Sequence, residues 1–97
     1  MPIWFTKHAT KRRIEHNIEE DELYRIINKG IRVQDLQAFG NSNRFLIIGK
    51  IDRKYWTLPC VQRKKNTTII TVKKANRDEI FIYKKRHKYM EKKKKHT

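Results

Sequence analysis

The stretch from Ile31 to Lys73 most constrains the fold, because its composition and punctuation are typical of antiparallel strands. β-Branched and aromatic residues dominate it, and short polar segments of the kind that form turns interrupt them. Pro59 lacks a backbone N–H, so we expect either a bulge there or an amide position that faces an unpaired edge. The four strands expected in this meander are Arg32–Phe39, Arg44–Ile51, Tyr55–Arg63 and Thr67–Lys73.

Two helices are expected ahead of the strands. Residues His8–His16 have helical spacing, and Asn17 after them tolerates the positive φ at which many helices end. The second helix should begin near Glu19, because the consecutive acids there complement the positive end of a helix dipole. Gly30 is its expected terminator. The apolar stripe of this second helix consists of Leu23, Ile26 and Ile27.

A short third helix is expected after the sheet. Asn76 and Glu79 stand three residues apart, which is the spacing of a capping box at a helix start. The helix should end as it enters the lysine-rich end of the chain. Two helices, a four-stranded antiparallel meander and this closing helix predict a small α+β domain with its helices on one face of the sheet.

The length and charge of the chain fit one domain followed by a basic tail. With 97 residues the chain is long enough for a single domain, and we assign residues 1–83 to it. Residues 84–97 form a lysine-rich tail that we expect to leave the helix and become disordered. The tail holds eight Lys or Arg and one Glu, so about half of the net charge of +15 lies on the compact part. That part should therefore attract phosphates on its own.

Several classes of protein are disfavoured by what the sequence lacks. It has no apolar run of the roughly 18 residues that a membrane span needs and no leader pattern, so we expect a cytoplasmic protein without a membrane partner. Its single cysteine, Cys60, can form neither an internal disulfide nor a multi-cysteine zinc site. The consecutive acids near Glu19 point in different directions around a helix and predict no metal site. We expect neither a metal ion nor a cofactor, because phosphate-binding loops and hydrolase motifs are also missing.

The residues that remain as candidates for a functional site are Lys and Arg side chains together with a few side chains that can carry a proton. The 2′-hydroxyl of RNA can attack the adjacent phosphorus without a metal if a base removes its proton and cations stabilise the added negative charge. His8 or Glu79 is the expected proton carrier. The candidate catalytic residues are His8, Arg12, Lys73, Arg77 and Glu79. The candidate RNA-binding residues are Lys50, Arg53, Lys54, Lys74 and Tyr83.

A structural role is the alternative for each of these residues. His8 and Arg12 share a helix face that could simply be exposed to solvent. Glu79 could serve only as a helix cap. Tyr83 has the spacing of a core or rim aromatic. The remaining aromatic candidates for base stacking would more readily fill a core in so small a domain; they are Trp4, Tyr55 and Trp56.

Two segments of the chain resemble the BrnT-type toxins of bacterial toxin–antitoxin pairs: Arg44–Asp52 and Ile69–Tyr83. In that family a strand ending in Ile-Ile-Ser-Ala-Arg is followed by an Ala and by a helix with Glu and Tyr. The positions of this chain that fall in step after the strand are Ala75, Arg77, Glu79 and Tyr83. Lys73 stands where the family has Arg and lacks its planar fork for phosphate. The lysine-rich tail is not part of the family pattern.

The resemblance implies a RelE-like fold, metal-independent cleavage of RNA and an antitoxin protein as the neutralising partner. We therefore expect an endoribonuclease toxin that cleaves mRNA, with the ribosome as a further candidate partner, and so inhibits translation. The opening of the chain, Thr6–Arg12 together with Ile18–Glu22, is more similar to a related and uncharacterised group of small domains.

Two alternatives from other classes stay open. The first is a non-catalytic nucleic-acid-binding module or regulator, in which the same cations contact only the backbone and no cleavage products form. The second is an interaction protein whose basic tail binds an acidic protein. Such a protein would need only the tail and would bind nucleic acid weakly once residues 84–97 are removed.

Overall fold

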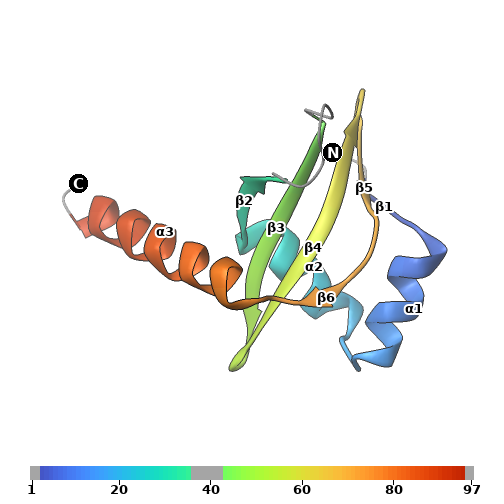
Figure 1. Ribbon diagram of the computed structural model, residues 1–97, viewed down its shortest axis with the longest axis horizontal. Helices are drawn as coiled ribbons and strands as arrows, with labels where there is room; N and C mark the ends of the chain where they lie inside the picture. Colours follow the sequence, from blue (N-terminus) through green and yellow to red (C-terminus); the bar gives the residue numbers. More distant parts are fainter. Residues whose placement is uncertain (1–2, 36–42, 96–97) are drawn as a thin grey trace.

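The computed structural model of the chain describes residues 3–35 and 43–95, with side chains up to Lys88. Figure 1 shows a twisted sheet with helices on both of its faces. The elements, in chain order, are β1 (Ile3–Phe5), α1 (Lys7–Glu15), α2 (Glu20–Lys29), β2 (Ile31–Gln34), β3 (Arg44–Ile51), β4 (Lys54–Arg63), β5 (Asn66–Ile69), β6 (Lys73–Lys74) and α3 (Arg77–Lys95).

The sheet confirms the predicted α+β class and differs from the prediction in its details. Strands β2, β3, β4 and β5 form the expected antiparallel meander. At the far edge β1 pairs with β5 in parallel, and β6 pairs with β4, so the sheet is mixed and has six strands. The first predicted strand is described only as Ile31–Gln34, and its residues 36–39 lie outside the described residues.

Helices α1 and α2 cover one face of the sheet and form the main core with it. Ile47 of β3 and Leu58 of β4 lie opposite each other and are fully buried. Leu23 and Ile26 of α2 pack against this face, and Ala9 brings α1 into the same cluster. Gly49 lets α2 approach closely, since a Cβ there would lie 2.7 Å from Cγ2 of Ile26. Burial of this apolar surface stabilises the fold.

The ends of both N-terminal helices follow local sequence rules. Thr6 caps α1 by accepting a hydrogen bond from Ala9 N–H, and Asn17 adopts a φ of 56° just after the helix, as predicted. Glu19 and Glu22 form a capping box at the start of α2. Gly30 ends that helix, although its φ of −71° is not left-handed. Both helix boundaries agree with the prediction to within one residue.

Pro59 lies where the ladder between β4 and β5 ends. Its carbonyl accepts a hydrogen bond from Ile70 N–H at 2.8 Å. Because the N and C=O of one strand residue point to the same side in an antiparallel ladder, the proline nitrogen faces Ile70 as well. The last paired residue of β5 is Ile69. The proline therefore removes only the return hydrogen bond to the Ile70 carbonyl, which accepts instead from Oγ1 of Thr6 at 2.6 Å.

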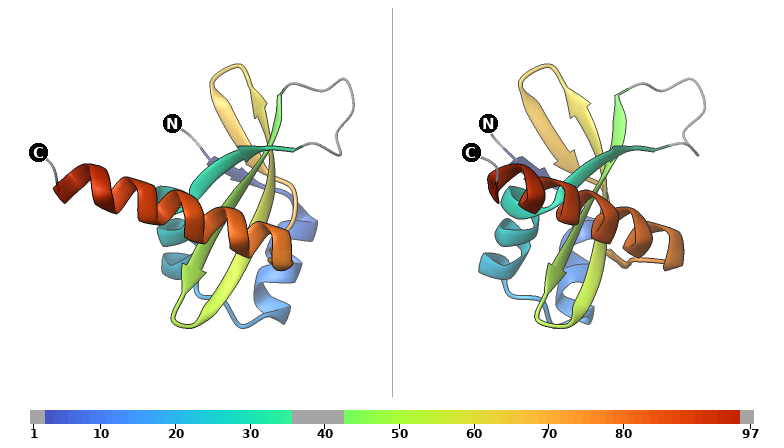
Figure 2. Two further views of the ribbon diagram at one scale, coloured as in Figure 1. Left: turned by 60° about the vertical axis from the view of Figure 1, so that its left-hand side comes forward. Right: turned by 90° about the vertical axis from the view of Figure 1, so that its left-hand side faces the viewer.

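Helix α3 lies on the face of the sheet opposite to α1 and α2. The prediction that all helices lie on one face of the sheet is therefore wrong. It begins against β2 and β3, and its later turns extend beyond the sheet edge, as the two views of Figure 2 show. It is also longer than predicted, because the helix continues without a break from Arg77 to Lys95. Among the described residues, no helix is long and apolar enough to cross a membrane.

Thr57 is fully buried on the α3 side of β4, and within the described residues its Oγ1 has no hydrogen-bond partner. An unpaired buried hydroxyl lowers stability, so Thr57→Val should raise the free energy of unfolding by about 1 kcal/mol. The half-buried Thr68→Val is the matched control and should change it by less than about 0.5 kcal/mol. Urea unfolding measures both values. A loss of stability in Thr57→Val would contradict this assignment.

Candidate nucleic-acid interface

Three aromatic rings meet where the start of α3 crosses the end of the β3–β4 hairpin. The rings of Tyr55 and Tyr83 are 5.6 Å apart in an edge-to-face arrangement, and Tyr83 stacks on His87 at 5.4 Å. The ammonium groups of Lys50 and Lys84 lie 5.3 and 5.7 Å from the centre of the Tyr55 ring. We call these five residues the aromatic–lysine cluster. It combines flat π-surfaces with positive charge, which are the two features that bases and phosphates recognise.

A carboxylate and an ammonium group lie beside this cluster at the start of α3. Glu79 is only 7% exposed, and its Oε1 accepts a hydrogen bond from Asn76 N–H at 2.8 Å. Asn76 Oδ1 in turn accepts from Glu79 N–H, so the predicted capping box is confirmed. The other carboxylate oxygen of Glu79 lies 4.0 Å from Nζ of Lys73. Glu79 therefore caps the helix and also presents a charge to Lys73.

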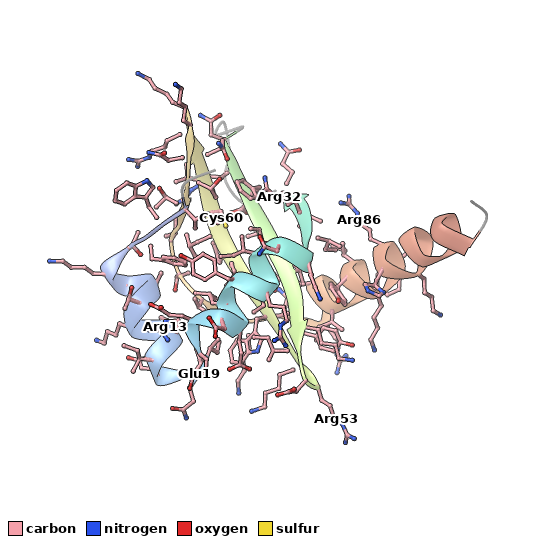
Figure 3. The ribbon with its side chains drawn as sticks, turned by 180° about the vertical axis from the view of Figure 1, so that it is seen from behind. Arg13, Glu19, Arg32, Arg53, Cys60 and Arg86 are labelled. Atoms are coloured by element: carbon pink, nitrogen blue, oxygen red, sulfur yellow. The ribbon has the colours of Figure 1, made fainter. Side chains whose placement is uncertain are left out.

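Helix α3 is held to the sheet edge by an arginine. Nη1 of Arg86 donates a hydrogen bond of 2.8 Å to the carbonyl of Arg32 in the edge strand β2. Both residues are labelled in Figure 3, where α3 leaves the sheet beside β2. This contact joins the middle of α3 to the edge strand. Two grooves open along the crossing, of about 1000 and 880 Å³, and they share Phe81, Lys85 and Lys88 as lining residues.

The structure brings five of the sequence-predicted site residues to the α3 side: Lys50, Lys73, Arg77, Glu79 and Tyr83. Lys50 lies opposite Tyr55 in the β3–β4 ladder and therefore shares its face. Arg77 is the first residue of α3 and is exposed. Lys73 and Arg77, two of the three residues predicted to hold phosphate, thus lie on the α3 side near the start of the helix, whereas the third, Lys74, does not lie on that side.

The other predicted site residues lie elsewhere. His8 and Arg12 are on α1, which packs on the opposite face, and Arg12 pairs with Glu15 at 3.5 Å. Lys54 and Lys74 belong to the face of α1 and α2, because strand alternation places them opposite Ile51 and Trp56. Arg53 lies at the tip of the β3–β4 hairpin and points into solvent in Figure 3.

The sequence interpretation left out three residues of the interface: Lys84, His87 and Phe81. Lys84 and His87 were treated as part of a tail, yet His87 follows Tyr83 by four residues, which places both on one side of a helix. Phe81 was expected to be an ordinary helix residue, and it is 66% exposed. Of the aromatic candidates for stacking, Trp56 is buried as expected, Tyr55 is half-buried and Trp4 is 59% exposed.

Metal-ligating side chains do not gather anywhere in the described part of the chain: it has no group of three or more His, Cys, Asp or Glu that could hold an ion. Cys60 stands alone and is buried on β4, where its Sγ donates to the carbonyl of Leu58. It therefore belongs to the core and not to the interface.

Native Cys60 should resist thiol reagents. Burial raises the pKa of the Cys60 thiol from 9.0 to about 12, against a smaller opposing effect of Arg32. The thiolate fraction at pH 8 is then about a thousandfold lower than in the unfolded chain, and labelling by an aromatic disulfide should slow at least as much. Because the folded pKa is raised, the free energy of unfolding should fall as the pH rises between these two values. Equal labelling rates with and without guanidinium would contradict this.

Taken together, the fold and the interface define a small, basic α+β domain with a mixed sheet and a cationic C-terminal helix. Residues 5–74 match the model of a family described as DUF4258, a domain of unknown function. The match covers more than half of the chain, and the chain belongs to this family. No curated protein and no solved structure matches it. The matched segment ends at Lys74, so α3 lies outside it.

Proposed function

We propose that the chain binds RNA on the side of the sheet that carries α3. The observation that carries this proposal is the aromatic–lysine cluster, in which Lys50 and Lys84 flank the Tyr55 ring and Tyr83 adjoins it. Cations neutralise phosphates, and aromatic side chains stack on unpaired bases without regard to sequence. The net charge of +15 adds a long-range attraction for the same ligand.

The salt dependence of binding tests this proposal. Each phosphate that a protein cation neutralises on a single strand contributes about 0.7 to the slope of log K against log salt. The double variant Lys50→Ala/Lys84→Ala should therefore reduce the slope measured with labelled RNA by about 1.4. A matched double variant on the opposite side, Lys11→Ala/Lys29→Ala, removes the same charge and should reduce the slope less. Equal reductions would point to diffuse attraction and would contradict a defined interface.

Cleavage of the bound RNA is a second candidate function, favoured by Lys73 and Glu79, which lie 4.0 Å apart and both line the larger groove. In this reaction Glu79 accepts the proton of the 2′-hydroxyl, the 2′-oxygen bonds to phosphorus, and the bond from phosphorus to the 5′-oxygen breaks. Lys73 and Arg77 stabilise the added negative charge, and the 5′-oxygen leaves with a proton from Lys73 or water. The products carry a 2′,3′-cyclic phosphate and a 5′-hydroxyl.

The toxin role belongs to this second candidate and is supported by the resemblance to BrnT-type toxins. Such a protein would stop bacterial growth when expressed without its antitoxin partner. Growth arrest by the wild type, and its loss in a variant that binds RNA but does not cleave it, would support the toxin role. Arrest by both proteins would instead favour the binding module, since binding alone would then be sufficient.

A further inference from the structure

The larger groove has an apolar floor that the phosphate chemistry above does not use. Val33, Leu46 and Pro59 lie directly opposite one another across β2, β3 and β4, so they share the α3 face. They are only half-buried, and all three line the groove beside α3. A flat apolar row is thus left open next to the helix.

Phe81 forms the wall of this groove. It lies on α3, is 66% exposed and lines both the larger groove and the one around the aromatic–lysine cluster. Its exposed ring offers a flat apolar face on which a base can stack. The volume of about 1000 Å³ is at the upper end of the range for small-molecule sites, so a nucleotide fits.

The charges around the groove favour a ligand with an anionic edge and a flat apolar part. Lys73, Lys85 and Lys88 line it, and the last two also line the groove of the aromatic–lysine cluster. Asp35 and Asp78 also line it, and their carboxylates disfavour a phosphate on that side while they can accept hydrogen bonds from base N–H groups. A nucleotide with its base on the floor and its phosphate toward the lysines satisfies both sets of charges.

We propose that this groove holds one unstacked base of a single-stranded nucleic acid, between Phe81 and the Leu46–Pro59 floor, with the adjoining phosphates along the lysines of α3. The inference rests on the RNA-binding function proposed above and adds a requirement for an unpaired base. A duplex, whose bases are stacked and paired, cannot enter a groove of this kind.

Abasic oligonucleotides separate base recognition from phosphate binding. Deoxyoligonucleotides are suitable probes because they lack the 2′-hydroxyl and cannot be cleaved by its attack. The wild-type chain should bind an intact single strand about tenfold more tightly than an abasic strand of equal length and charge. Phe81→Ala should reduce this preference, because the stack on Phe81 is lost while stacking on Tyr55 and Tyr83 can remain, and it should leave the affinity for the abasic strand unchanged. Trp4→Ala, which removes an aromatic of similar exposure from the opposite sheet edge, should keep the preference.

The possible results distinguish the two proposals. Equal binding of intact and abasic strands would overturn the base site and leave RNA binding in place. Tighter binding of a duplex than of a single strand would have the same two consequences. Loss of the preference in Trp4→Ala but not in Phe81→Ala would place base recognition elsewhere and would also overturn it. If neither deoxy strand bound, and a 2′-O-methyl RNA strand also failed to bind, the RNA-binding function itself would fail.

Discussion

Gly30→Ala is expected to destabilise the fold by about 3 kcal/mol, a large part of the total stability of a small domain. A Cβ at this position would lie 2.5 Å from the carbonyl oxygen of Ile26 and 2.7 Å from that of Ile48. Both atoms belong to the backbone, in α2 and β3, and cannot move aside as a side chain would. The effect therefore comes from close packing and not from backbone conformation, since φ is −71°.

Chemical unfolding of Gly30→Ala and of its neighbour Lys29→Ala measures this effect. Lys29 is exposed, so its replacement should change the free energy of unfolding by less than about 0.5 kcal/mol. The midpoint for Gly30→Ala should fall while the slope with denaturant stays the same. A loss below about 1 kcal/mol would show that the end of α2 and strand β3 can separate without cost, contrary to the packing described.

Arg77→Ala is expected to slow RNA cleavage by about a hundred- to a thousandfold while the Kd for RNA changes little. Cations that are positioned before the reaction stabilise charge that develops only in the transition state, and losing one has an effect of this size. Arg77 is the first residue of α3 and lies between the two residues of the Asn76–Glu79 capping box, so this box fixes the backbone that carries it. Single-turnover cleavage with EDTA present, and a binding titration, give the two quantities.

Glu79→Gln is the companion variant, because glutamine can keep the cap while it removes the negative charge. Its side-chain oxygen can still accept from Asn76 N–H, so the helix start should persist. Cleavage should be lost while binding is kept. Arg63→Ala, at an exposed arginine at the end of β4, is the control and should cleave at the wild-type rate.

For Arg77→Ala, equal losses of cleavage and affinity would contradict a role in the transition state and would reduce Arg77 to a binding contact.

Elements with a long, regular pattern were predictable from the sequence. Helix α2 has an apolar stripe between a capping box and a glycine, and β3 and β4 are runs of eight and ten residues rich in β-branched and aromatic side chains between turn segments. Strands β1 and β6, with three and two residues, are too short to show a period. Their pairing with β5 and β4 is decided by tertiary contacts that no local pattern contains.

The interface was only partly predictable for a similar reason. Lys50 and Tyr83 were identified as binding residues from their charge and type, but Tyr55 and Tyr83 meet only because α3 crosses the sheet. The helix length was underestimated because a run of lysines was interpreted as a solvated tail, whereas Lys and Arg are also good helix formers. His8 and Arg12 were grouped with the C-terminal cations by chemistry alone, and the sheet separates them.

The most direct test of RNA binding on the α3 side is a map of backbone amide shifts on adding RNA. A short 2′-O-methyl single strand serves as the probe, since it cannot be cleaved by 2′-hydroxyl attack. We expect the shifts to gather on α3 and on the β3–β4 residues around Lys50 and Tyr55, and to leave α1 and α2 unchanged. Shifts centred on α1 and α2 would contradict RNA binding on the α3 side. The absence of any shift, at RNA concentrations that saturate similar basic domains, would contradict RNA binding itself.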